Sequence, residues 1–171
     1  MKKLTLILRR ASDATDRVTR WALFPIAVAF ILIVFGGVMT RFVFRTPMVS
    51  SEEFARITFL WICFLGAAIC VKQETHIRFE LLDNLLGRAR PVFNLAITLV
   101  SIGFYLFLIV KGMELFLHVL PTMFPASGIS QAWMYGVLPL SCVLMMVHSA
   151  YFILRDASML VGKVFDQGEA E

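Results

Sequence analysis

The sequence predicts an all-α integral membrane protein with four transmembrane helices. Of its 171 residues, 59% are hydrophobic and only 16% are charged, whereas a soluble domain carries about 25% charged residues. The hydrophobic residues are also clustered in uncharged stretches, which cover residues 22–40, 57–71, 91–110 and 115–154. A spanning helix needs about 20 mostly apolar residues, because each residue rises about 1.5 Å through a hydrocarbon core of about 30 Å. These stretches exclude an ordinary soluble domain.

The predicted spans cover residues 21–44, 53–72, 91–112 and 132–154 of a single membrane domain, 1–171. The last uncharged stretch is too long for one helix, and PTMFPASGISQ (residues 121–131) divides it. Two prolines, a glycine and several polar residues favour a loop there. The second span is short, and we expect Arg56 to lengthen it by extending its side chain toward the membrane surface.

Amphipathic surface helices are predicted at the N-terminus, within residues 1–20, and between the second and third spans. In the first segment Leu4, Leu8 and Val18 fall near one helical face, and charged residues lie elsewhere. The second segment, HIRFELLDNLLGRARP, carries leucines on one face and closes with a glycine and a proline. Their basic charge indicates contact with anionic membrane lipids, and no nucleic-acid module is visible.

The distribution of lysine and arginine predicts the orientation of the spans. Twelve of the sixteen basic residues lie in the N-terminal segment, in the loop between the second and third spans, and in the tail of residues 155–171. The other four lie on the opposite side. Because basic residues are enriched in cytoplasmic loops, both termini are expected in the cytoplasm. We therefore predict a multi-pass protein of the bacterial inner membrane.

The stretch SSEEFAR, residues 50–56, places charges where the second span begins. Ser50 and Glu53 have the spacing of a capping box, and the helix dipole favours carboxylates in the first turn. Glu53 is also predicted to form an ion pair with Arg41 across the short outer hairpin. Two interpretations stay open for the remaining outer charges, which are either solvated or in contact with a docking protein: Arg45, Glu52, Arg56 and Lys111.

No residue pattern indicates a catalytic site, a metal site or a bound cofactor. The three cysteines lie inside apolar spans and form no C-x-x-C pair, so they are expected to be packing residues. Histidines could ligate haem, and His76 and His148 are the two that could approach each other. A membrane anchor subunit of a redox enzyme, binding haem or quinone, therefore remains an alternative.

The middle of every predicted span lacks aspartate and glutamate. Secondary transporters usually couple transport to protons or sodium through intramembrane carboxylates or broken helices. The absence favours a scaffold or accessory subunit. A self-sufficient small transporter remains a third hypothesis.

The stretch EEFARITFLWICFLGAAICVKQETHIRFELLDNLL resembles the DctQ-like small membrane subunit of tripartite ATP-independent periplasmic (TRAP) transporters. The resemblance rests on residues that occur in order at their expected places: Arg41, Glu53, Trp61, the LGAA of residues 65–68, and the His76-Ile77 pair. Chain length, four spans and cytoplasmic termini match as well.

The resemblance implies a division of labour among three proteins. A periplasmic substrate-binding protein captures an organic acid, such as a C4-dicarboxylate, sialic acid or a similar carboxylate. A large permease subunit carries the sodium and substrate sites, so no substrate site is expected on this chain. The small subunit would pack beside the large one, with Trp61, Gly66 and His76 as packing residues, and its outer face would help to receive the binding protein.

Overall fold

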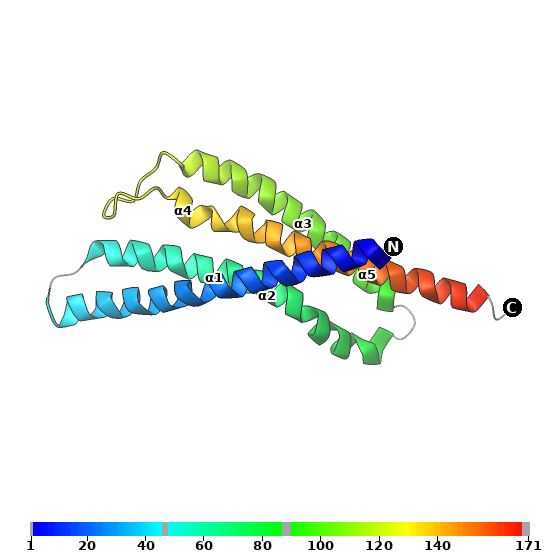
Figure 1. Cartoon of the computed structure of the whole chain (residues 1–171). Coiled ribbons are helices and arrows are strands. Elements are labelled where there is room, and N and C mark those ends of the chain that lie inside the picture. The colour runs from blue at the N-terminus through cyan, green and yellow to red at the C-terminus, as the bar shows by residue number, and fades with distance from the viewer. Residues whose placement is uncertain (1, 46–47, 87–89, 169–171) are drawn as a thin grey trace.

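The computed structural model arranges the chain as a helical bundle of two antiparallel pairs (Figure 1). It describes the backbone of residues 2–45, 48–86 and 90–168, and the side chains of residues 6, 8–45, 48–73 and 96–154. The helices are α1 (Lys2–Phe42), α2 (Val49–Leu86), α3 (Arg90–Val119), α4 (Ala132–Tyr135) and α5 (Val137–Gly168). Helix α1 packs on α2 and α3 packs on α5, and the pairs meet where α2 and α1 contact α5.

Among the residues that the structure describes, four helical segments are long and apolar enough to cross a membrane: Leu8–Phe42, Val49–Gln73, Ala96–Val119 and Ala132–Leu154. This confirms the predicted all-α fold with four spans. The described residues contain no strand, and their one isolated antiparallel bridge joins Met123 to Ser130.

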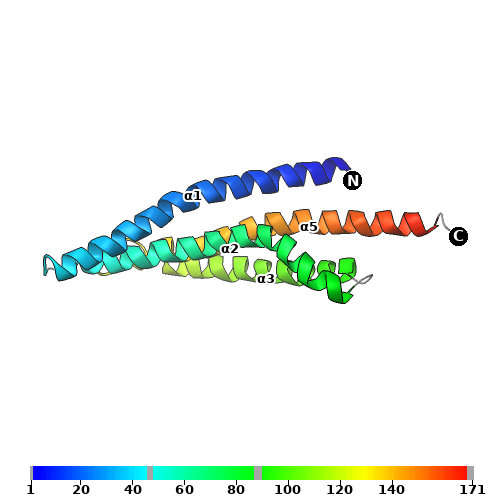
Figure 2. The same ribbon diagram turned by 90° about the horizontal axis from the view of Figure 1, so that it is seen from below.

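Residues 2–20 of the first segment predicted as a surface helix and residues 76–86 of the second are helical and belong to the same helices as the spans, whereas residues 87–89 lie outside the described residues. Helix α1 already begins at Lys2, and α2 continues to Leu86. A helix of 41 residues is about 60 Å long, roughly twice the hydrocarbon thickness, so the polar part of α1 extends beyond the core. Figure 2 shows that α1 bends along its length. Pro25 supplies a cause, because proline removes one hydrogen bond inside a helix.

Helix α3 continues past residue 112, the predicted end of the third span, to Val119. Lys111 and Glu114, which follow the uncharged stretch of residues 91–110, lie inside this helix. In the structure they form an ion pair of 2.7 Å one turn apart, with both side chains exposed. A pair at this spacing is compatible with a helix surface. Helix α2 begins at Val49, before residue 53, the predicted start of the second span.

The bundle has two distinct ends, and both chain termini lie at one of them (Figure 1). We call this the termini end. The turn between α1 and α2 and the loop of residues 120–131 lie at the opposite end, called here the loop end. An even number of spans places the termini together, so the arrangement follows directly from the helix count.

The core lies between α2 and α5. Leu65, Ala68 and Ile69 of α2 are buried, as are Val137 and Cys142 of α5. In contrast, α1 and α3 expose many large apolar side chains, including Ile31, Phe35, Val100 and Phe107. Such surfaces are suited to lipid or to another membrane helix, and would be unfavourable in water.

Candidate functional site

Glu53 joins α2 to the loop at the loop end of the bundle. Its carboxylate accepts hydrogen bonds from the backbone N–H groups of Ala126 (3.0 Å) and Ser127 (2.7 Å). Only 8% of Glu53 is exposed. Hydrogen bonds to an ionised carboxylate are shorter and stronger than neutral ones. Glu53 therefore holds the loop against α2.

The conformation of the loop explains why these two N–H groups need an acceptor. Phe124 accepts from the N–H of Gly128 at 3.0 Å and donates to the carbonyl of Ile129 at 2.8 Å, which closes a tight turn over residues 125–127. Gly128 has a φ of 68°, a conformation that glycine adopts readily. Pro125 has no N–H. The N–H groups of Ala126 and Ser127 therefore converge on a single carboxylate.

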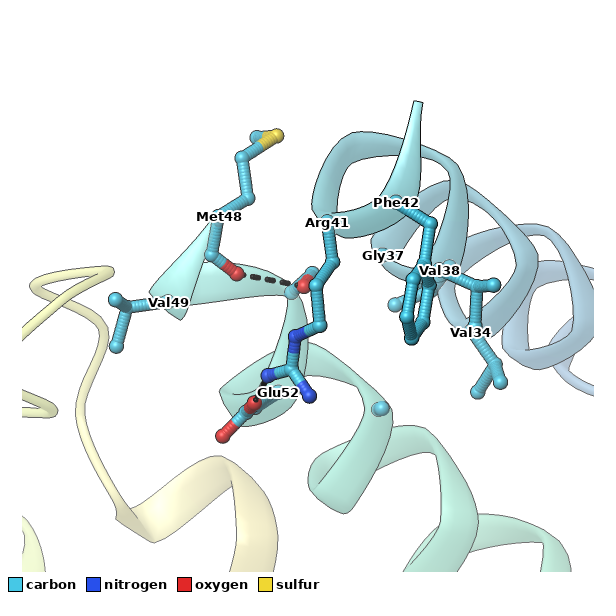
Figure 3. Close-up of a pocket in the computed structure, with 11 residues that line it drawn as sticks. Val34, Gly37, Val38, Arg41, Phe42, Met48, Val49 and Glu52 are labelled. Carbon is cyan, nitrogen blue, oxygen red and sulfur yellow. Dashed lines mark hydrogen bonds and ion pairs between the residues drawn. The ribbon is translucent and has the colours of Figure 1, made fainter. Parts of the chain in front are cut away.

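The structure pairs Arg41 with Glu52, which corrects the predicted pairing with Glu53. Arg41 Nη2 lies 2.6 Å from Glu52 Oε1, and both side chains are more than half exposed. Figure 3 shows the two side chains meeting between the end of α1 and the start of α2. Consecutive residues on a helix point about 100° apart. Glu52 therefore faces α1 when Glu53 faces the loop.

The predicted capping box is not formed by Ser50 and Glu53. Helix α2 begins at Val49, so Ser50 already lies in its first turn. Glu53 is bonded to the loop instead of to the start of its own helix. The next hydroxyl, Ser51 Oγ, donates to the carbonyl of Met48 at 2.6 Å. Glu53 of the S-x-x-E pattern thus makes a tertiary contact and not a local cap.

The other predicted outer charges are all exposed. Arg45 follows α1 with a φ of 53°, and Arg56 lies one turn after Glu53 on α2. Lys111 is further from the loop end, on α3, and bonds to Glu114. The structure therefore brings Glu52 together with Arg41 but does not gather the four candidate docking residues into one cluster.

Among the residues predicted to pack, Trp61 contacts another helix of this chain. Its indole N–H donates to the backbone carbonyl of Trp133 in α4 at 2.8 Å. Gly66 has open space where a side chain would project, so its predicted packing would need a second protein. The side chain of His76 lies outside the described residues.

A second group of polar residues lies nearer the termini end and joins α1, α2 and α5. Lys72 of α2 donates to the carboxylate of Asp13 at 2.7 Å and to the backbone carbonyl of Ser12 at 3.3 Å, and it lies 3.6 Å from Asp16 Oδ2. The Ser12 hydroxyl forms a hydrogen bond of 2.7 Å with Nδ1 of His148 in α5. We call these five residues the inner polar cluster.

Two members of the cluster, Ser12 and His148, are each 1% exposed. Burying a polar group costs free energy unless the group is hydrogen-bonded, and Ser12 and His148 are hydrogen-bonded to each other. One ring nitrogen of His148 is therefore engaged by a serine. The described part of the chain contains no group of three or more His, Cys, Asp or Glu side chains that could hold a metal ion.

Neither this cluster nor the role of Glu53 as an acceptor for the loop was predicted from the sequence. A partial signal was present, because Asp13 and Asp16 lie one turn apart on the polar part of α1. Lys72 was counted among the basic residues of the loop after the second span, whereas it lies inside α2. Nothing in the sequence pattern relates residues 12 and 148 to each other.

In comparisons with known proteins, the chain is similar to components of one type of transporter. A family model for tripartite ATP-independent periplasmic transporters, DctQ component, matches residues 30–159. The sialic acid TRAP transporter small permease protein SiaQ of Vibrio cholerae is 30% identical over 145 residues, which cover 81% of this chain and 80% of that protein. A putative TRAP transporter small permease protein of Haemophilus influenzae is 27% identical over 133 residues, 72% of this chain and 82% of that protein.

A longer protein also matches. The sialic acid TRAP transporter permease protein SiaT of Haemophilus influenzae is 25% identical over 132 residues. That match covers 77% of this chain but 21% of SiaT, so the chain spans about a fifth of that relative. The matched family is one of transporter components and not of enzymes.

Proposed function

We infer that this chain, which belongs to the DctQ component family of tripartite ATP-independent periplasmic transporters, acts as a fixed scaffold for the large permease subunit and helps to dock a periplasmic substrate-binding protein. The family match over residues 30–159 is the observation that carries this proposal, since it includes the second, third and fourth spans completely and the end of the first. The exposed apolar faces of α1 and α3 supply surface for a membrane partner.

The proposed transport reaction is the sodium-driven uptake of an organic acid. Two of the relatives are named as sialic acid transporter components, which supports a carboxylate: sialic acid, a C4-dicarboxylate or a similar compound. Residues 17–51, 54–73, 95–113 and 115–155 contain no aspartate or glutamate. Coupling through intramembrane carboxylates is therefore assigned to the large subunit. The family membership does not favour the alternative of a haem- or quinone-binding redox anchor.

Reconstitution of the transporter with and without this chain tests the function. Vesicles that hold the large permease subunit and this chain, with the binding protein and substrate added outside, should accumulate substrate when sodium is supplied outside. Vesicles that lack this chain should lose most of this uptake, because the scaffold and part of the docking face are missing. Vesicles that contain this chain alone should show none.

Robust uptake by this chain alone would contradict the scaffold function and favour a self-sufficient transporter. Full uptake without this chain would remove it from the transport mechanism. A haem absorption spectrum of the purified chain would instead support the alternative function, a membrane anchor of a redox enzyme.

We place the chain in the bacterial inner membrane with both termini in the cytoplasm and the loop end in the periplasm. The excess of basic residues in the N-terminal segment, the loop between α2 and α3, and the tail supports this orientation. In this placement the loop held by Glu53 faces the binding protein. The exposed charges of Arg45, Glu52 and Arg56 are then available for electrostatic docking, with Lys111 nearer the membrane.

Cysteine labelling tests the orientation. The native Cys63, Cys70 and Cys142 are first changed to alanine, and single cysteines are introduced at the exposed positions Met48 and Ala11. A membrane-impermeant maleimide should react with the cysteine at position 48 in intact spheroplasts. It should react with the one at position 11 only after permeabilisation. The reverse pattern would overturn the orientation.

A further inference from the structure

A groove lies between the end of α1 and the start of α2, at the loop end (Figure 3). Its cavity volume is about 230 Å³. Apolar side chains line most of it, including Val34 and Val38 of α1 and Val49 and Ala55 of α2. A dry apolar cavity of about 150 Å³ is large enough for a benzene ring. The groove can therefore accept several methylene groups.

Gly37 lines the groove at a close approach of α1 to α2. A Cβ atom at this position would lie 2.9 Å from Ser51 Oγ, so α1 approaches α2 closely there. A Cβ atom at the neighbouring Gly36 would meet no atom within 4 Å. The missing side chain at residue 37 thus permits the close contact of the two helices beside the groove.

Two opposite charges line the part of the groove nearest the loop end. Arg41 lies seven residues beyond Val34, about 10 Å along α1, and it is bonded to Glu52 of α2. Their side chains are 58% and 63% exposed. A guanidinium has five N–H donors and a carboxylate has about four acceptor positions. The bond of 2.6 Å between them therefore leaves most of these positions available.

An apolar groove that ends in an adjacent cation and anion complements one class of membrane molecule. We propose that the groove binds a zwitterionic phospholipid with a primary ammonium group, that is, one with a phosphoethanolamine head. The phosphate binds Arg41, since arginine matches phosphate geometry. The ammonium donates to Glu52, and one acyl chain lies along Val34 and Val38. Water does not replace the chain, because it would find few polar partners there.

This assignment is independent of the transport function, since it rests on one groove and its charges. It requires only that the loop end lies at a membrane surface. Phosphatidylcholine lacks N–H donors on its ammonium, and phosphatidylglycerol lacks the ammonium altogether. Both should therefore bind less well than phosphatidylethanolamine with the same acyl chains.

Photolabelling of the full-length chain in vesicles tests the site. Three probe lipids carry the same diazirine-bearing acyl chain and differ only in the head: ethanolamine, choline or glycerol. Labelled residues are mapped by peptide mass spectrometry. The ethanolamine probe should label peptides covering residues 33–42 and 48–55 at least about threefold more than the other probes, because only its head satisfies both charges through hydrogen bonds.

Substitutions separate the groove from the head-group contacts. Val34→Trp fills the groove and should remove most of the labelling. Val28→Trp is the matched control, because Val28 is a similarly exposed valine on α1, 40% against 42%, and does not line the groove. Ala55→Phe fills the groove from α2 and serves if the first variant folds poorly. Arg41→Gln and Glu52→Gln should each abolish the preference for ethanolamine.

Four results would overturn the proposal. The first is labelling spread evenly along α1, and the second is labelling that both groove-filling variants leave unchanged. The third is equal labelling by the three probes, which would indicate an acyl chain without head recognition. The fourth is loss of labelling when the large permease subunit is present in the vesicles. That result would assign the groove to a helix of the partner.

Discussion

Replacing Glu53 with glutamine is expected to release the loop of residues 120–131 from α2 and to remove most of the transport supported by the complete system. The variant loses the negatively charged carboxylate, which accepts hydrogen bonds from the backbone N–H groups of Ala126 and Ser127. Its amide also presents N–H donors to backbone N–H groups. The amides of residues 126 and 127 should exchange with solvent roughly tenfold faster or more, because charge-assisted hydrogen bonds are about twice as strong as neutral ones.

Glu52→Gln is the matched control for this experiment, because it is the same change at the adjacent residue. Glu52 is exposed and bonds to Arg41 instead of to the loop. Its substitution should leave exchange at residues 126 and 127 unchanged. Equal acceleration in both variants would contradict the specific role of Glu53. Faster exchange in Glu53→Gln together with normal transport would support the role of Glu53 in holding the loop, but it would show that the loop is not needed for docking.

Replacing Lys72 with methionine is expected to loosen the first part of α1 from the bundle. The side chain of Lys72 is 22% exposed and that of Asp16 is 15% exposed, so their attraction is less screened than at a surface. Breaking a buried ion pair costs about 3–5 kcal/mol and an exposed one about 0–1 kcal/mol. We expect a loss of about 1–2 kcal/mol for this intermediate case. Thermal unfolding in detergent measures the loss.

Hydrogen exchange locates the same effect. Amides of residues 8–20 should exchange faster in Lys72→Met, whereas those of residues 26–42 should not. Lys111→Met is the matched control: its ion pair with Glu114 has the same length as that of Lys72 with Asp13, 2.7 Å, but both of its side chains are well exposed. It should change neither stability nor exchange measurably. If the two variants behave alike, the inner polar cluster does not pin α1.

Features that depend on local composition could be predicted from the sequence. Clustered apolar residues predicted four spans, since crossing a membrane depends on the length and hydrophobicity of one segment. The resemblance in the second span predicted the family, which the match over residues 30–159 confirms. The ends of the helices do not follow from the charge pattern alone, because charges such as Lys111 and Glu114 can remain on a helix surface when they pair.

The partners of the charged residues were decided only by the tertiary structure. The sequence placed Glu53 and Arg41 at the same end of the molecule, and both do lie there. It could not show that Glu53 points toward residues 126 and 127, 73 and 74 positions away. A rotation of about 100° along the helix exchanges the neighbours of Glu52 and Glu53. That rotation is set by how α2 packs on α1 and α5.

The inner polar cluster shows the same limit more strongly. Ser12 and His148 are separated by 136 positions and meet only because α1 and α5 pack together. Hydropathy reports whether a residue is compatible with membrane or water, but it carries no information about which polar side chain is nearest. By itself the sequence therefore determined the spans and the family. The helix packing decided which polar groups satisfy each other, since a hydrogen bond requires its two atoms to lie within about 3 Å.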